Sequence, residues 1–416
     1  MNDHRALFHR EINAVILGPE PVENLAIPLD LAEAVAVQGL QILFGNLELF
    51  EQLKLLKRPQ SGNLRGADLI ENNLKHGERL QNPETRIKIE SKTARPWLLS
   101  LDSCLWILDS HPMRCFYSQE LELALPEGHP FPMEKFRVSK DMLLEGGILK
   151  PEEIIEVRAA DSHLLQRVHD QAYIGKIQSG LLDRKEQILL GLPVTGKLFT
   201  RSATEVEATR RACHAALEEG VGVCLAGGTH HAFTNHGEGY CVFNDIAIAI
   251  RDLQDKQPNI RIMVVDTDAH QGNGTAAILG EDPRVFTYSI HVGKNYPTRK
   301  VVGSLDVETI RYVEGEMYLQ QLFGTLAKAL DDFAPDLVIW ISGADNHRND
   351  RFGQMHLSLK DIQRRDEVLL GAFIKNRIPV AILYGGGYNR QPEFTAKLHR
   401  NTIATAKRLA AQYRGL

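Results

Sequence analysis

The chain has 416 residues, of which 43% are hydrophobic and 24% are charged, and its formal net charge at pH 7 is −5. This length predicts about two domains and enough apolar residues for a sizeable core. The slightly acidic balance excludes a protein that holds nucleic acid through bulk positive charge, so we predict no direct nucleic-acid binding.

Cysteine usage and the first residues bear on the compartment. The five cysteines are odd in number and form no Cys-x-x-Cys pair, which argues against a disulfide scaffold or a thiolate zinc site. Charged residues precede any apolar run, so no secretory signal peptide is recognisable. The most apolar window, residues 32–50, contains two glutamates and is too polar for a membrane span. We expect a cytoplasmic protein without a membrane span, and export by an unrecognised signal stays open.

Residues 1–110 differ from the rest of the chain. Apolar residues between Leu31 and Leu53 recur at helical spacing and predict one or two amphipathic helices with a packing face. Residues 75–95 are polar and rich in Lys and Arg, which is typical of a solvated surface. We predict a mainly helical N-terminal extension of unknown role over 1–110 and a second domain over 111–416.

From about Cys115 onward, apolar strand-like runs alternate with helical stretches. Strands are predicted at 115–118, 221–225, 262–265, 285–290, 337–341 and 380–383. Helices are predicted at 133–145, 162–179, 202–219, 244–257, 313–332, 358–376 and 393–411. This alternation predicts an α/β fold with three layers, in which helices cover both faces of a mostly parallel sheet.

Four of the predicted strands end in unusual polar sequence. The segments are Gly-Gly-Thr-His-His at 227–231, Asp-Thr-Asp-Ala-His at 266–270, Ser-Gly-Ala-Asp at 342–345 and Gly-Gly-Gly-Tyr at 385–388. Open α/β sheets bind ligands at the carboxyl ends of their strands, so the four loops can converge on one crevice. Each segment alone also fits an ordinary turn, but four at successive strand ends favour a common site.

The segment at 266–270 indicates a metal. Alternate residues of an extended chain face the same side, so Asp266, Asp268 and His270 can share one face. Carboxylate oxygen together with imidazole nitrogen is a ligand set that suits zinc.

Five segments give the region from Cys115 to the C-terminus a specific resemblance to a known family. They are GGTHHAF (227–233), GEGYCVFND (237–245), VVDTDAHQGNGTAA (264–277), SGADNHRNDRFG (342–353) and LYGGGYNR (383–390). The region resembles the arginase/deacetylase fold and, within it, the zinc-dependent histone deacetylases. Among these it is most similar to class IV members and their bacterial relatives.

The resemblance implies a role for each matching residue. It implies one zinc ion per chain, held by Asp268, His270 and Asp345, with an open position for water and substrate. His230 and His231 would be the tandem histidines, with His231 as general base and acid, and Tyr388 would donate to the substrate carbonyl. The backing residues of the two histidines would be Asp266 and Asn273.

The resemblance also implies a substrate channel and a second ion. Gly239 would accept the substrate amide N–H, Tyr240 and Tyr296 would form the facing walls, and Phe352 would sit at the rim. A structural potassium ion would be held by Asp266, Ser289 and main-chain oxygens.

Three departures from the common family pattern concern the site. Asn273 stands where many relatives have aspartate, so His231 should be less basic than in those members. Tyr240 and Tyr296 stand where phenylalanine is common, and we expect their hydroxyls to contact the acyl group or each other. The loop 191–195 lacks the aspartate that clamps the substrate peptide in many members.

The implied activity is hydrolysis of Nε-acetyl-lysine in a protein, which includes histone tails and a role in chromatin regulation. Alternatives within the fold are deacylation of long-chain acyl-lysine, deacetylation of small amines such as acetylpolyamines, and a dinuclear manganese ureohydrolase. The last needs a carboxylate two residues after His270, where the chain has Gly272. An alternative of another class is a non-catalytic acyl-lysine binder, for which the six polar groups of the implied centre would be unnecessary.

Overall fold

The computed structural model describes residues 113–414, and these form one sheet with helices on both faces. The eight strands have the order β2-β1-β3-β8-β7-β4-β5-β6, and every neighbouring pair is parallel. The strands are β1 (Cys115–Tyr117), β2 (Ile154–Glu156), β3 (Val221–Cys224), β4 (Ile262–Asp266), β5 (Val285–Val292), β6 (Leu305–Thr309), β7 (Leu337–Ile341) and β8 (Val380–Leu383). This confirms the predicted three-layer α/β fold.

The central strands are buried on both faces, because the helices that connect parallel strands cover the sheet on each side. Every residue of β3, β4, β7 and β8 is buried. Strands β4, β7 and β8 are rich in Val, Ile and Leu, and β3 reads Val-Gly-Val-Cys, so all four lack the polar alternation of half-exposed strands. The four lie next to one another in the sheet and form its centre.

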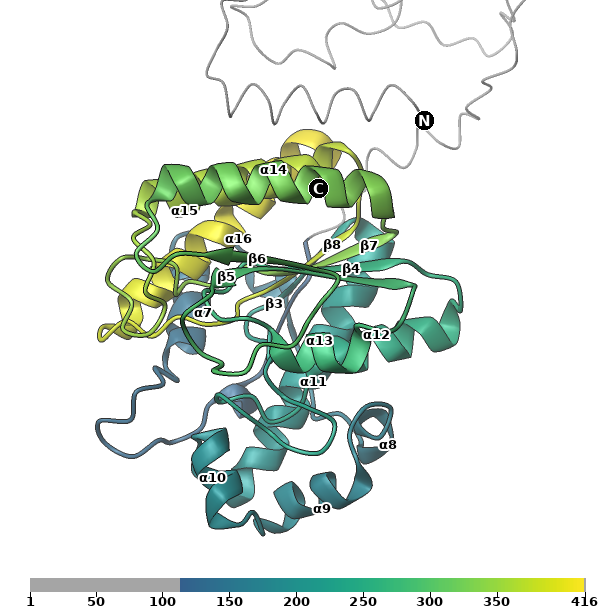
Figure 1. Cartoon of the computed structure of the whole chain (residues 1–416), viewed down its shortest axis with the longest axis vertical. Coiled ribbons are helices and arrows are strands. Elements are labelled where there is room, and N and C mark those ends of the chain that lie inside the picture. The colour runs from purple at the N-terminus through teal and green to yellow at the C-terminus, as the bar shows by residue number, and fades with distance from the viewer. Residues whose placement is uncertain (1–112, 415–416) are drawn as a thin grey trace, which may run out of the picture. The chain divides into compact units, whose positions relative to one another are not determined.

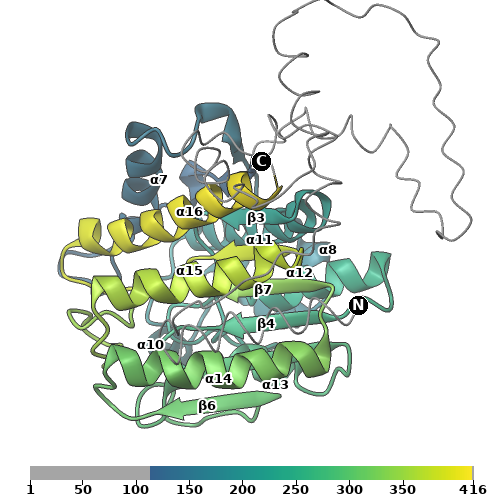
Figure 2. The same cartoon turned by 90° about the horizontal axis from the view of Figure 1, so that it is seen from above.

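Helices α14, α15 and α16 cover one face of the sheet, and α11, α12 and α13 cover the other (Figure 1). Seen from above, α14, α15 and α16 lie side by side over the sheet and run roughly along its strands (Figure 2). The helices are α7 (Lys135–Glu145), α8 (Ser162–Leu165), α9 (Gln171–Ser179), α10 (Arg184–Leu190), α11 (Gly196–Glu219), α12 (Asp245–Lys256), α13 (Asn273–Leu279), α14 (Gly315–Phe333), α15 (Leu359–Lys375) and α16 (Pro392–Arg414).

The predicted helix over 162–179 is wrong in one respect, because it is two helices. Between α8 and α9, the ring of His169 is buried and accepts a hydrogen bond from the backbone N–H of Asn244 at 2.9 Å. This contact draws the chain inward where a continuous helix would carry it along the surface. Strands β2 and β6 and helices α10 and α13 were not predicted from the sequence.

The amphipathic helices and polar stretch predicted within residues 1–110 lie outside the described residues, so the domain boundary near 110 stays a prediction. Within the described range, no helix combines the length and the apolar character needed to cross a membrane.

Candidate active site

The predicted polar segments meet at one edge of the sheet. His230 and His231 follow β3, Asp268 and His270 follow β4, Asp345 follows β7, and Tyr388 follows β8. These four strands are neighbours in the sheet and all parallel, so their carboxyl ends point to the same edge. The architecture therefore brings together side chains that are up to 158 positions apart in the chain (388 − 230 = 158).

Asp268, His270 and Asp345 form a buried cluster in which the ligand atoms all lie within 4.8 Å of one another. The Nδ1 atom of His270 is 3.1 Å from a carboxylate oxygen of Asp268 and 2.8 Å from one of Asp345. Burial and repulsion from Asp268 raise the pKa of Asp345 to about 8. Two buried carboxylates beside an imidazole fit a divalent cation, and the donor set suits zinc.

Backbone contacts hold the two ligand carboxylates in place. The N–H groups of Ala269 and His270 donate to Asp345 and Asp268 at 2.9 and 3.0 Å. The N–H of Gly386 donates to the other oxygen of Asp268 at 2.6 Å. A Cβ at Gly386 would lie 2.5 Å from a carboxylate oxygen of Asp345 and 2.6 Å from one of Asp268, so only glycine lets this loop approach the cluster.

The tandem histidines lie against each other, with ring centroids 4.0 Å apart, and each is backed by a different group. His230 Nδ1 is 2.7 Å from Asp266, and His231 Nδ1 is 2.7 Å from the amide oxygen of Asn273. Burial opposes a charge on His230, but Asp266 and Asp268 outweigh it and raise the pKa of His230 to about 9.

His231 has the opposite electrostatics. Burial and the neighbouring rings of His230 and His270 hold the pKa of His231 well below its ordinary value. His231 is therefore neutral near pH 7 and can accept a proton, whereas His230 is charged. The hydrogen bond with Asn273 acts in the opposite direction and raises the pKa of His231, but burial and the two neighbouring rings outweigh it. That His231 is less basic than in relatives with aspartate at position 273 stays a prediction.

Tyr388 lies beside the cluster, with its ring centroid 6.1 Å from that of His270. Its backbone N–H donates to Asp350 at 2.5 Å, and its carbonyl accepts from Arg351 Nε at 2.8 Å. Burial and the charges of Asp268 and Asp345 raise the pKa of Tyr388 well above its ordinary value. The phenol therefore keeps its proton near pH 7, so its hydroxyl can donate a hydrogen bond.

A cavity of about 320 Å³ opens onto this cluster. Its lining residues are Ile188, Leu189, Leu190, Gly191, His231, Gly239, Tyr240, His270, Asn295, Tyr296, Arg351, Phe352, Gln354 and Tyr388. The structure thus places all four predicted channel residues on the cavity wall together with His231, His270 and Tyr388. The lining residues include no Asp or Glu.

The hydroxyl of Tyr296 has a partner that was not predicted from the sequence. It donates to Glu238 at 2.8 Å, and the Tyr296 ring meets that of His231 edge-on at 5.0 Å. Contact of the Tyr240 and Tyr296 hydroxyls with an acyl group or with each other stays a prediction. The potassium ion stays a prediction; two of its implied ligands, Asp266 and Ser289, are register partners on β4 and β5.

Sequence reasoning missed three residues of the site: Lys135, Glu238 and Asp350. The Nζ of Lys135 donates to the carbonyls of Gly385 and Gly387 at 3.0 and 3.4 Å, and Asp350 accepts from the backbone N–H of Tyr388. Lys135 and Asp350 together fix the loop that carries Tyr388. Glu238 and Asp350 lie inside the motif segments 237–245 and 342–353, which was the only available signal for them. Lys135 lies outside all five segments, and its contacts depend on the folded chain.

The buried Lys135 leads to a prediction of how the stability of the protein depends on pH. Burial lowers the pKa of Lys135 to about 8, against an ordinary value of 10.5. Because the folded state loses this proton first, its stability should rise between pH 8 and 10.5 relative to a Lys135→Met variant. The shift corresponds to about 3 kcal/mol in the free energy of unfolding. Urea unfolding of both proteins, freed of metal by a chelator, measures it across this range.

Lys328→Met is the control for that measurement, because the Lys328 side chain is 77% exposed. Its free energy of unfolding should run parallel to that of the wild type over the pH range in which Lys135 titrates. Parallel pH curves for wild type and Lys135→Met would show that Lys135 keeps its ordinary pKa in the folded protein.

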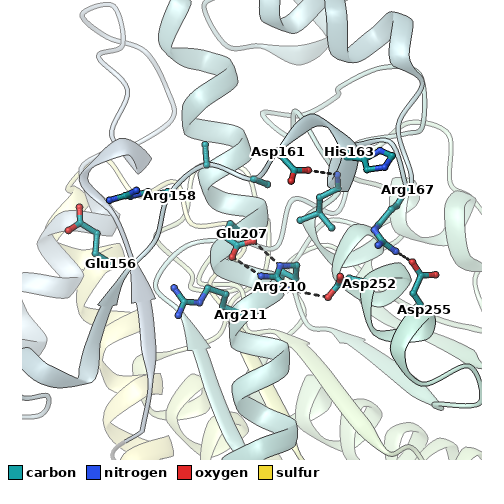
Figure 3. Close-up of a pocket in the computed structure, with 13 residues that line it drawn as sticks. Glu156, Arg158, Asp161, His163, Arg167, Glu207, Arg210, Arg211, Asp252 and Asp255 are labelled. Carbon is teal, nitrogen blue, oxygen red and sulfur yellow. Dashed lines mark hydrogen bonds and ion pairs between the residues drawn. The ribbon is translucent and has the colours of Figure 1, made fainter.

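A second and larger cavity, of about 780 Å³, lies beside α8, α11 and α12 (Figure 3). Most of its charges neutralise one another: Arg210 is paired with Glu207 at 2.8 Å and with Asp252 at 3.3 Å, and Arg167 is paired with Asp255. Among the described residues, the metal-ligating cluster lies in the other cavity. The larger cavity is therefore not the candidate active site.

Comparison with known proteins agrees with this geometry. The sequence profile of the histone deacetylase domain matches residues 129–405. An uncharacterized protein of Picosynechococcus is 38% identical over 272 residues, which are 65% of this chain and 91% of that protein. Histone deacetylase 2 of Arabidopsis thaliana is 30% identical over 271 residues, which cover 62% of this chain and 70% of that protein.

A further relative and a solved structure extend the comparison. The acetoin utilization protein AcuC of Staphylococcus aureus is 29% identical over 299 residues, which cover 66% of this chain and 76% of that protein. The crystal structure of the HDA15 HD domain superposes with a TM-score of 0.59 at 19% identity, covering 71% of this chain and 88% of that one.

The parallel sheet with its site at the strand ends defines a hydrolase of the arginase/deacetylase fold. Within that class, the chain belongs to the histone deacetylase family.

Proposed function

We propose that the chain is a zinc-dependent lysine deacetylase that hydrolyses Nε-acetyl-lysine in a protein to lysine and acetate. The observation that carries the proposal is one cavity whose wall combines His270 of the Asp-His-Asp cluster, the neutral His231 and the protonated Tyr388. An acceptor for a proton, a donor to an oxyanion and a cation site are the groups that amide hydrolysis requires.

Asp268, His270 and Asp345 would hold the ion. When bound, zinc would polarise the acyl carbonyl and lower the pKa of a water molecule. His231 accepts the proton of the attacking water and returns it to the leaving amine of lysine. Tyr388 donates its hydroxyl to the carbonyl oxygen as negative charge develops there, and Lys135 and Asp350 keep its loop in place.

The cavity wall supports acyl-lysine over the two other candidate types of chemistry. Tyr240, Tyr296 and Phe352 offer apolar surface to the four-carbon stem of lysine. A cationic polyamine would find Arg351 and no carboxylate on the wall. A second metal, as in a ureohydrolase, would lack a carboxylate at Gly272, and the preceding Gln271 donates to Val301 and Asp306 instead.

The proposal is tested by incubating the zinc-loaded full chain with an acetyl-lysine peptide and measuring acetate release. Parallel reactions contain a myristoyl-lysine peptide and an acetylated polyamine. We expect the highest kcat/KM for the acetyl-lysine peptide. No turnover of any of the three would contradict a deacylase, and preference for the myristoyl peptide or the polyamine would correct the substrate class.

A further inference from the structure

We propose that Glu238 is a positioning residue that fixes the tautomer of His231 by acting through Asn273. This inference rests on the proposed role of His231 as the general base. It concerns a carboxylate that forms no part of the cavity wall and contacts neither the cluster nor His231 itself.

The contacts form a chain of three hydrogen bonds. One carboxylate oxygen of Glu238 accepts from Asn273 Nδ2 at 3.2 Å and from the hydroxyl of Tyr296 at 2.8 Å. The amide oxygen of Asn273 is 2.7 Å from His231 Nδ1. The Glu238 side chain is 13% exposed, and Asn273 and His231 are buried, so little water can replace these partners.

The local backbone holds Glu238 in this position. Glu238 and Cys241 exchange backbone hydrogen bonds of 3.1 and 2.9 Å, which close a tight turn. Gly239 and Tyr240, at its tip, have φ of 53° and 68° and face the cavity. A Cβ at Gly239 would lie 2.8 Å from the His231 ring and 2.9 Å from the Tyr296 ring, so glycine is required there.

The charge state of Glu238 agrees with an acceptor role. Burial opposes its charge, but hydrogen bonds from His236, Tyr296 and Asn273 outweigh burial and lower the pKa of Glu238. The ionised carboxylate can only accept hydrogen bonds.

Because the Glu238 carboxylate can only accept, it fixes the orientation of the Asn273 side-chain amide, whose NH₂ group donates and whose oxygen accepts. Because Nδ2 must face Glu238, the amide oxygen faces His231. His231 then carries its proton on Nδ1 and leaves Nε2 free to accept one. Without Glu238 the amide can turn, offer its NH₂ group to Nδ1 and move the ring proton to Nε2, which blocks the base. The carboxylate also polarises the amide and supplies, one residue further out, the charge that Asn273 lacks.

The test is a cycle of variants that exchanges the two polar groups. Glu238→Gln alone weakens the acceptor, and Asn273→Asp alone places two carboxylates face to face. We expect each to lower kcat/KM by about 10-fold, the low end for residues that orient groups of a metal site. The double variant Glu238→Gln/Asn273→Asp restores one carboxylate and one amide in exchanged order and should recover to within about threefold of the wild type. Glu145→Gln, an exposed residue on α7, is the matched control.

A readout that needs no turnover separates this proposal from the proposed function. Protein with ¹⁵N-labelled histidine reports the tautomer of His231 by NMR, with the His231→Ala spectrum used for assignment. We expect the Nδ1–H form in the wild type and a mixture of both forms in Glu238→Leu. Unchanged tautomers in that variant, or losses that simply multiply in the double variant, would overturn the role of Glu238. Wild-type protein that shows the expected tautomers but turns over no acyl-lysine substrate would instead overturn the proposed function.

Discussion

Asp345→Asn is expected to abolish metal retention and to lower kcat/KM by about 10³-fold or more. The variant keeps the acceptor for the N–H of Ala269 but removes one of two carboxylate ligands. Loss of several kcal/mol of charge stabilisation at the reacting carbonyl corresponds to that factor. Zinc measured by atomic emission after dialysis should fall from one per chain in the wild type to near zero.

The stability of Asp345→Asn relative to the wild type should depend on whether metal is present. In metal-free protein, burial beside Asp268 raises the pKa of Asp345 to about 8, so folding has to keep this acid protonated at neutral pH. The neutral amide avoids that cost, and the variant should unfold at the same or a higher temperature than the wild type. With zinc at 1,000 times its Kd, the wild type should gain about 4 kcal/mol that the variant does not. Asp332→Asn, with a side chain 63% exposed in the parent chain, is the control. Full zinc content in Asp345→Asn would contradict the ligand assignment.

The sheet shows which parts of a fold can be predicted from sequence. The predicted bounds of the strands at 262–265, 337–341 and 380–383 agree with β4, β7 and β8 to within one residue. These strands are buried on both faces, so their apolar runs are long and end abruptly. Strands β2 and β6 lie at the two edges of the sheet, are only partly buried and contain acidic residues, so they gave no comparable signal.

The residues of the candidate site also fall into those that could be predicted from the sequence and those that could not. The residues at strand ends could be predicted, because parallel strands bring their carboxyl ends together and the motif segments matched a known family. Lys135 could not, since the carbonyls of Gly385 and Gly387 that it binds lie about 250 residues further along the chain. Glu238 stood inside a motif segment, but its contact with Asn273 depends on the turn at 238–241 and the start of α13.

Tyr388→Phe is expected to lower kcat by about 10²- to 10³-fold and to leave KM and zinc content close to those of the wild type. The hydroxyl is the donor toward the developing oxyanion, and loss of one such donor typically costs this factor. The ring itself contacts Phe352 and His270 with centroids 5.3 and 6.1 Å away, and phenylalanine preserves this apolar wall. Steady-state kinetics with the acetyl-lysine peptide measures kcat and KM separately.

The matched control is Tyr384→Phe, four residues earlier on the same segment. The Tyr384 hydroxyl is bonded to Ser139 at 2.7 Å, and its ring stacks on His399 away from the cavity wall. Loss of the Tyr384 hydroxyl should lower the free energy of unfolding by about 1 kcal/mol and leave kcat unchanged. Because Tyr388→Phe retains the metal ligands and Asp345→Asn retains the phenol, the pair separates loss of the ion from loss of the donor. Wild-type kcat in Tyr388→Phe would remove the phenol from the mechanism while leaving the metal site intact.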